Sequence, residues 1–203
     1  MYELAQATDE LIEAGNTLYR MGMVPATSGN FSARLVNGDI AITVSGAHKG
    51  KLSQADIMLL DPEGKPRDAR KPSAETALHT QIYSLFPKVN CVLHPHAMNA
   101  VLLSKLRNEF VVLQDYELLK AFAGVTTHNT SVRVPIFPND QDIPRLARQA
   151  QPYLEQNPDT VAYIIAGHGF YTWGDNVATT MRHIEALDYL FACEMALERR
   201  DKL

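Results

Sequence analysis

The apolar run Val161-Ala-Tyr-Ile-Ile-Ala166 is the feature that most constrains the fold of this chain. A strand with one face in solvent alternates apolar and polar residues, whereas a near-continuous apolar run is typical of a strand that is covered on both faces. Such a strand belongs to a sheet that lies between two layers of helices.

Strand and helix patterns alternate along the rest of the chain. We expect helices at about residues 4–21, 74–83, 97–106, 117–123, 142–154 and 175–200, with Ser73 and Asp175 as caps of the second and last. We expect strands at 31–36, 39–44, 57–60, 89–94, 110–113, 131–137, 161–166 and 170–173. The first two strands flank Asn37-Gly38, which favours a type I′ hairpin turn. This mixture predicts an α/β fold with a mixed sheet between helical layers.

Composition excludes several classes of protein. The 203 residues contain 19 Lys and Arg against 23 Asp and Glu, a formal charge of −4, which disfavours a general nucleic-acid binder. The longest apolar runs fall far short of the ~20 residues that cross a bilayer. The start of the chain lacks the cationic leader of a signal peptide. We therefore expect a single domain over residues 1–203, with no nucleic acid or membrane as partner.

Only two cysteines are present, Cys91 and Cys193, and both lie in apolar surroundings. Two are too few for a disulfide framework, so a reducing cytoplasm is the expected compartment. Neither has a neighbour that would activate a thiolate, and the chain has no glycine-rich nucleotide loop.

His94-Pro95-His96 directly follows an apolar strand. Residues two apart on an extended backbone project to the same side, so both imidazoles can reach one cation. The alternative interpretation is a pair of hydrogen-bonded histidines at a strand end.

Gly167-His168-Gly169 directly follows the apolar run at residues 161–166. Glycines on both sides allow close approach of the backbone, although a turn with an incidental histidine has the same pattern. Together with His94 and His96, His168 offers a third neutral nitrogen, and three histidines leave a coordination position open for water or substrate. Zinc is the first choice of ion, while iron, cobalt and manganese also suit imidazole.

The remaining histidines, His48, His79, His128 and His183, fit ordinary structural or surface roles. Glu75 and His79 are one helical turn apart, so they can share a face and support the metal ligands from outside the coordination sphere.

Small polar residues recur at the expected ends of strands and helices. They are Thr27-Ser28-Gly29-Asn30, Ser45-Gly46 with Lys49 nearby, and Ser73 after Lys71-Pro72. Hydroxyls, amides and free backbone N–H groups bind a phosphate dianion, although the same residues are common in plain turns and caps. Their recurrence indicates a composite anion pocket.

These motifs, taken in order along nearly the whole chain, resemble the class II aldolase/adducin family. Residues 114–120, 127–140 and 166–174 are more similar to the dehydratases of that family that act in methionine salvage than to its sugar-phosphate aldolases.

The resemblance implies a three-layer α/β/α fold with a central mixed, largely antiparallel sheet, and a homotetramer with active sites near subunit boundaries. It implies one Zn²⁺ per subunit, held by His94, His96 and His168, and Glu117 as the catalytic carboxylate. The implied reaction is the loss of water from a five-carbon ketose phosphate with a terminal methylthio group. The phosphate would be bound by Gly29, Asn30, Ser45, Gly46 and Ser73.

Two other functions fit the same residues. The aldolases often carry two serines before the glutamate that matches Glu75, and the second is Ala74 here. Glu75 itself matches the aldolase acid/base or metal-side carboxylate, so it is a possible additional acid/base, and an aldolase or a pentulose-phosphate epimerase is the nearest alternative. A non-catalytic, adducin-like interaction module would not need the complete set of histidines.

Overall fold

The computed structural model, which describes residues 1–200, is built on one eight-stranded sheet in the order β3-β2-β1-β4-β8-β7-β6-β5. The strands are β1 (Asn30–Arg34), β2 (Ile40–Thr43), β3 (Ile57–Leu60), β4 (Cys91–His94), β5 (Phe110–Gln114), β6 (Ser131–Phe137), β7 (Ala162–Ile165) and β8 (Gly169–Gly174). Neighbouring strands are antiparallel except β6 and β7, which are parallel. The expected mixed, largely antiparallel sheet is confirmed.

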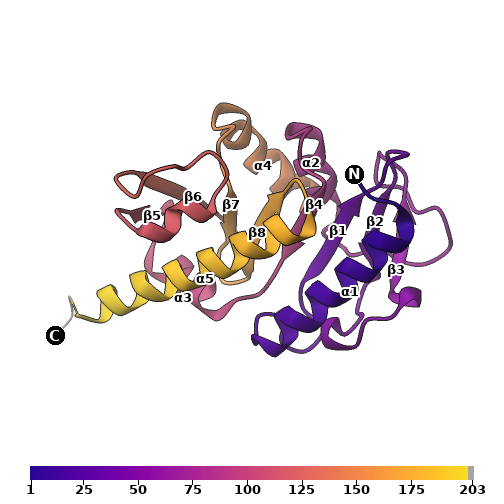
Figure 1. Ribbon diagram of the computed structural model, residues 1–203, viewed down its shortest axis with the longest axis horizontal. Helices are drawn as coiled ribbons and strands as arrows, with labels where there is room; N and C mark the ends of the chain where they lie inside the picture. Colours follow the sequence, from indigo (N-terminus) through magenta and orange to yellow (C-terminus); the bar gives the residue numbers. More distant parts are fainter. Residues whose placement is uncertain (201–203) are drawn as a thin grey trace.

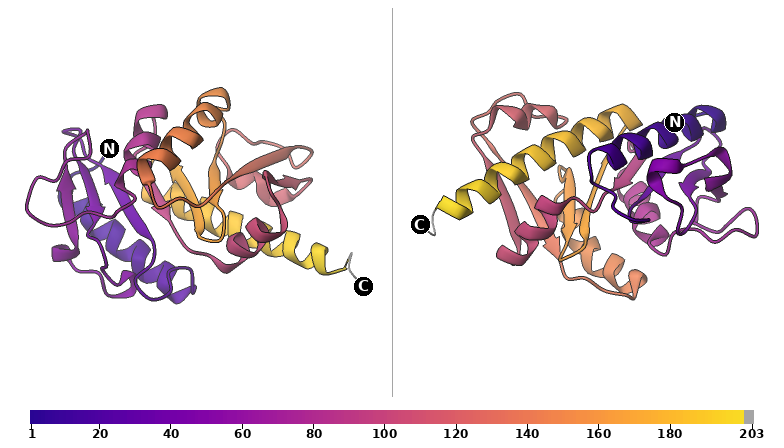
Figure 2. Two further views of the ribbon diagram at one scale, coloured as in Figure 1. Left: turned by 180° about the vertical axis from the view of Figure 1, so that it is seen from behind. Right: turned by 90° about the horizontal axis from the view of Figure 1, so that it is seen from below.

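Helices cover both faces of this sheet (Figures 1 and 2). Helices α1 (Leu4–Arg20), α3 (Met98–Leu106) and α5 (Val177–Arg200) pack their buried apolar residues against one face. Helices α2 (Thr76–Leu85) and α4 (Ile143–Gln156) pack on the opposite face. The three-layer α/β/α arrangement is therefore as expected.

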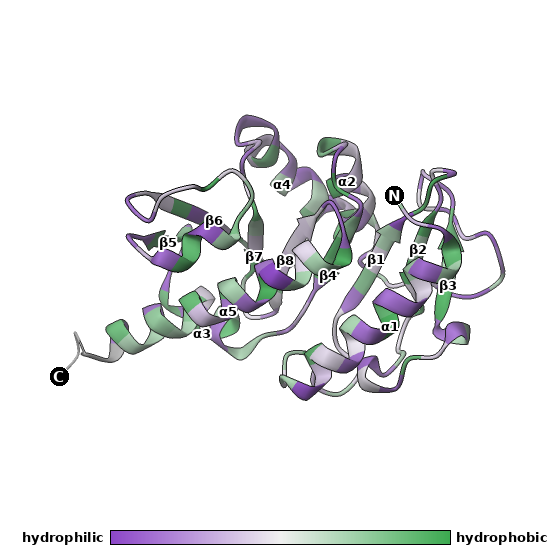
Figure 3. Cartoon of the chain, in the orientation of Figure 1, coloured by the Kyte–Doolittle hydropathy of each residue, from purple (hydrophilic) through white to green (hydrophobic). Residues whose placement is uncertain are grey.

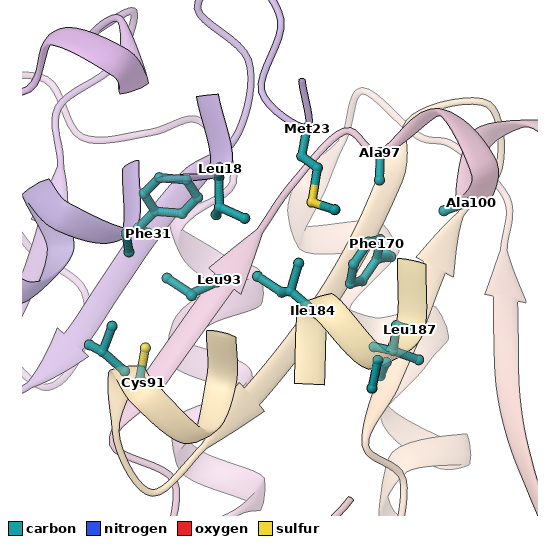
Figure 4. Close-up of a cluster of buried hydrophobic side chains, with 14 of the residues drawn as sticks. Leu18, Met23, Phe31, Cys91, Leu93, Ala97, Ala100, Phe170, Ile184 and Leu187 are labelled. Carbon is teal, nitrogen blue, oxygen red and sulfur yellow. The ribbon is translucent and has the colours of Figure 1, made fainter. Parts of the chain in front are cut away.

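Strand β7 shows why the apolar run is continuous. Ala162 and Ile164 belong to the core on the α1–α3–α5 side, and Tyr163 and Ile165 belong to the core on the α2–α4 side. Figure 4 shows the first of these cores, where side chains from strands β1, β4 and β8 meet those of α1 and α5. In Figure 3 strands β2 and β3 are largely hydrophobic, whereas the loop after β3 is hydrophilic.

The first hairpin forms at the expected place but with a different turn. A type I′ turn requires a positive φ at both central residues, here Asn37 and Gly38. Gly38 has a φ of 88°, but the φ of Asn37 is not positive. The N–H of Gly38 donates to the carbonyl of Leu35 (3.0 Å), and the N–H of Leu35 donates to Asp39 (2.8 Å). The loop therefore has three residues and ends on a left-handed glycine, and the type I′ prediction is wrong.

Three helix starts also differ from expectation. Helix α2 begins at Thr76 after Glu75, and the Ser73 hydroxyl accepts only a long bond of 3.3 Å from the Glu75 N–H. Helix α5 is capped by Asn176, whose side chain accepts from the Thr179 N–H (2.7 Å), in place of Asp175. The helix expected at 117–123 is a short 3₁₀ turn, η3 (Glu117–Ala121). None of the helices within residues 1–200 is long and apolar enough to cross a membrane.

Candidate metal centre and phosphate pocket

Three histidines converge at one end of the central strands. His94 is the last residue of β4, His96 follows two residues later, and His168 lies in the turn between β7 and β8. Strands β4 and β8 are hydrogen-bonded neighbours (Figure 1). That turn therefore comes to lie beside His94. The Nε2 atom of His168 is 3.4 Å from Nε2 of His94 and 3.0 Å from Nε2 of His96. Residues far apart in the chain thus form a group that could hold a metal ion.

The spacing of the three imidazoles fits a small divalent ion. Zinc binds histidine nitrogen at about 2.0–2.1 Å in tetrahedral sites, so two ligand nitrogens on one ion lie roughly 3.3–3.4 Å apart. The His94–His168 separation equals that value, and the His96–His168 separation is slightly shorter. The ligand atoms of all three histidines lie within 4.8 Å of one another, so the residues fit one small ion.

The protonation of these rings also suits metal binding. The Nδ1–H of His94 donates to the carbonyl of Phe170 (2.8 Å), which leaves the lone pair on Nε2, the atom that faces the cluster. Burial lowers the pKa of His94 well below its ordinary value, and the neighbouring His168 acts in the same direction. Burial, followed by the effect of His94, lowers the pKa of His96 to about 3. At neutral pH both are therefore neutral ligands.

Two glycines allow the backbone to close around the cluster. A Cβ on Gly169 would collide with the carbonyl oxygen of Pro95, between the two histidines of the first motif. A Cβ on Gly29 would lie 2.7 Å from the carbonyl oxygen of His94, and Gly29 has a φ of 78°. Both positions therefore need glycine, and the sequence suggested such a close approach for the glycines beside His168.

The carboxylate of Glu75 lies against the histidines. Its Oε2 is 3.3 Å from Nε2 of His94, and its Oε1 is 3.3 Å from Nε2 of His168. Oε2 also accepts hydrogen bonds from the amide nitrogen of Asn30 (2.6 Å) and the hydroxyl of Tyr171 (3.1 Å). Glu75 is 7% exposed, so these donors hold a nearly buried acid beside the cluster.

A cavity of about 400 Å³ opens over the cluster. Its walls include all five residues expected to bind phosphate, together with Glu75, His96 and His168; the remaining lining residues are Thr27, Val44, Ala74, Asn139, Asp140, Gln141 and Ile143. The expected phosphate-binding turns and two of the three histidines therefore line the same cavity.

Lys49 forms hydrogen bonds to two of the turns beside the cavity, one at Thr27 and one at Ala47. It is 1% exposed, and its ammonium group donates to the carbonyls of Thr27 (3.1 Å) and Ala47 (2.6 Å). Burial lowers the pKa of Lys49 to about 8, so the group is still largely charged at neutral pH. A positive charge is thus buried behind the turns that line the cavity.

Glu117 lies elsewhere in the single chain. It sits at the start of η3 with a side chain that is 73% exposed, and its carboxylate pairs with Lys120 (2.7 Å) and His128 (3.6 Å). The hydrogen bond from Lys120 lowers the pKa of Glu117. Glu117 is not among the residues that line the cavity.

Sequence reasoning did not assign a role to Tyr171 or to residues 139–141. Tyr171 stacks on His94 with ring centroids 4.1 Å apart and donates to Glu75. Asn139, Asp140 and Gln141 reach the cavity because parallel strand β6 ends beside the turn after β7. The sequence pattern carries no local signal for either contact. The two cysteines play no part here, and burial raises the pKa of Cys91 to about 12.

Comparison with known proteins agrees with this arrangement. Residues 9–197 match the family model described as Class II Aldolase and Adducin N-terminal domain. The fold is similar to that of l-fuculose-1-phosphate aldolase from Thermus thermophilus, with a TM-score of 0.79 at 21% identity over 99% of this chain and 100% of the other.

Curated relatives are more similar in sequence. A methylthioribulose-1-phosphate dehydratase from Methylococcus capsulatus is 61% identical over 91% of both chains. One from Pseudomonas paraeruginosa is 53% identical over 94% of both chains. With the family match over most of its length and relatives at these identities, the chain belongs to the class II aldolase and adducin family.

Proposed function

We propose that this protein is a zinc-dependent hydro-lyase that converts 5-methylthioribulose 1-phosphate to 2,3-diketo-5-methylthiopentyl 1-phosphate and water in methionine salvage. The observation that carries the proposal is the complete triad of His94, His96 and His168. It occurs in a chain that is 61% and 53% identical to two methylthioribulose-1-phosphate dehydratases. The two free cysteines and a small phosphorylated substrate support a cytoplasmic location.

The three histidines would hold one zinc ion per chain. When bound there, zinc supplies a Lewis acid that makes a proton beside a ketone easier to remove. His94 is fixed by its bond to the Phe170 carbonyl, so its Nε2 is oriented before any ion arrives. The protein contributes three imidazole donors in a mostly buried setting.

The phosphate would bind at the turns that line the same cavity. Gly29, Asn30, Ser45, Gly46 and Ser73 line this region, and the buried charge of Lys49 lies behind it. Backbone N–H groups and hydroxyls of this kind bind dianions. A phosphate held here places the ketose carbons against the histidines, which turns binding energy into orientation.

Loss of water needs an acid/base beside the substrate. A carboxylate takes the proton from C3, the hydroxyl at C4 leaves as water with a proton, and the resulting enol tautomerises to the diketone. We assign this role to Glu117, with Glu75 as a possible additional acid/base. Because Glu117 is exposed and lies outside the cavity of its own chain, its role requires a second subunit to bring it there. This fits a homotetramer with sites near subunit boundaries.

An aldolase or epimerase is the second candidate. The observation in its favour is Glu75, whose carboxylate lies 3.3 Å from both His94 and His168, where it can act on a substrate at the ion. A non-catalytic module has less support, because such a protein has no use for the intact triad.

The test is a comparison of substrates. Zinc-loaded protein is incubated separately with methylthioribulose 1-phosphate, fuculose 1-phosphate and ribulose 5-phosphate, with and without a chelator. We expect chelator-sensitive release of diketone from the first alone. Dihydroxyacetone phosphate from fuculose 1-phosphate, or epimerised ribulose 5-phosphate, without diketone would overturn the proposal.

The intersubunit role of Glu117 has a separate test. Glu117→Gln and His96→Ala are each expected to be inactive, but mixed assemblies of the two contain some sites with an intact triad and a normal Glu117 from the neighbour. Partial recovery of activity on mixing supports the assignment. No recovery in assemblies shown to contain both chains would contradict it.

A further inference from the structure

A continuous chain of buried hydrogen bonds runs behind the cavity, from Tyr83 to Glu75. The Tyr83 hydroxyl contacts the Ser32 hydroxyl (2.8 Å), and Ser32 contacts Nδ1 of His79 (2.7 Å). Nε2 of His79 bonds to Oδ1 of Asn30, and the Asn30 amide nitrogen donates to Glu75 (2.6 Å). His79 and Ser32 are fully buried, and Asn30 and Tyr83 are 5% and 6% exposed.

The chemistry of these groups allows one direction of donation. The Oε2 atom of Glu75 already accepts from the Tyr171 hydroxyl, and Asn30 turns its NH₂ group toward this acceptor and its oxygen toward His79. An amide oxygen only accepts, so Nε2 of His79 must carry the proton. Nδ1 of His79 then has a lone pair and accepts from Ser32, which in turn accepts from Tyr83.

The tautomer of His79 therefore selects the orientation of the Asn30 amide. With the proton on Nδ1 instead, the flipped amide would fit His79 equally well. It would then place its oxygen against the carboxylate oxygen of Glu75, where two acceptors repel each other. Only the tautomer with the proton on Nε2 leaves every member of the chain with a partner.

The last two members of this chain reach the site itself. Asn30 and Glu75 both line the cavity, and Glu75 lies 3.3 Å from His94 and His168. His79 does not line the cavity, so it acts through Asn30. The Tyr171 hydroxyl also donates to Glu75, so the carboxylate keeps one donor when the other is lost.

We propose that His79 is a positioning residue. Its Nε2–H fixes the Asn30 amide so that N–H, and not oxygen, is presented to Glu75 and to an anion in the cavity. This inference rests on the proposed function only in taking the cavity as a phosphate site. It adds to the site a histidine that binds neither metal nor substrate.

Two substitutions separate positioning from packing. The amide nitrogen of glutamine can replace Nε2 of histidine, whereas that of asparagine corresponds to Nδ1. We expect His79→Gln to keep the affinity of the zinc-loaded protein for inorganic phosphate within about threefold. We expect His79→Asn to weaken it about tenfold or more and to lower kcat, with zinc content unchanged. Equal losses in both variants, or no loss in either, would overturn the proposal.

A double-mutant cycle tests the route through Asn30. Asn30→Leu has nearly the shape of asparagine and removes the NH₂ group without adding a charge. We expect His79→Asn to add almost no further loss of phosphate affinity in that background, because the two changes remove the same donor. Fully additive losses would contradict the proposal. Phosphate affinity and zinc content do not depend on which ketose is the substrate, so a failed dehydratase assay leaves this test intact.

A measurement on the unmodified protein does not depend on variant folding. A nitrogen–proton correlation spectrum of protein labelled with ¹⁵N-histidine reports which ring nitrogen of each histidine carries hydrogen. The His79 signals, assigned by their absence in His79→Gln, should show hydrogen on Nε2. Hydrogen on Nδ1 would overturn the proposal.

Discussion

Acidification should destabilise this protein in part through His79, and His79→Gln should remove that part. Burial lowers the pKa of His79 to about 4, from 6.5 for an exposed histidine. The unfolded chain therefore binds more protons than the folded chain between these two values. The free energy of unfolding falls as the pH falls, starting near pH 6.5 and ending near pH 4.

The magnitude follows from the two pKa values. The difference between the two pKa values corresponds to a total loss of about 3.4 kcal/mol in the free energy of unfolding. About 2 kcal/mol of this loss has occurred at pH 5, and almost none at pH 7. Wild-type protein should therefore lose about 2 kcal/mol more than His79→Gln when the pH is lowered from 7 to 5. His94 and His96 also stay neutral when buried, but they contribute to both proteins alike.

Urea unfolding at pH 7 and pH 5 measures the difference. Both proteins are used without zinc and at one concentration, because metal binding and assembly each depend on conditions and add to apparent stability. Equal losses on acidification in the two proteins would refute the reasoning. They would mean that His79 takes up a proton in the folded state at its ordinary pKa.

Three further substitutions probe the site. His96→Ala should lose zinc as well as activity, and full zinc occupancy by elemental analysis would count against its role as a ligand. Glu117→Gln should keep its zinc while turnover falls by roughly 10²–10⁴-fold, so normal turnover in a steady-state assay would refute its assigned role. Ser73→Ala should weaken phosphate binding, measured by calorimetry, by roughly 1–3 kcal/mol, because a hydrogen bond to a charged group is lost. An unchanged affinity would leave Ser73 with only its contact at the start of helix α2.

The layers of the fold and the cluster of three histidines could be predicted from the sequence because local patterns indicate them. The continuous apolar run of β7 reflects burial on both faces, and each half of its side chains does enter a separate core. His94 ends a buried strand and His96 follows two residues later. His168 lies between two glycines, and at Gly169 a Cβ would collide with the neighbouring backbone. The pairing of β4 with β8 then brings the rings together.

The details that depend on distant residues could not be predicted. Whether Asn-Gly forms a type I′ turn depends on the φ of Asn37, which the pairing of the flanking strands decides. His79 forms hydrogen bonds with Ser32 and Asn30, which are more than forty residues away in the chain. Glu117 carries no local sign that it points to solvent and not into the cavity of its own subunit.

Diffraction data collected at the zinc absorption edge from crystals grown with zinc would test the central claim most directly. We predict one anomalous peak per chain, within about 2.1 Å of a ring nitrogen of His94, His96 and His168. A cluster without such a peak, or a peak held by other residues, would contradict the account.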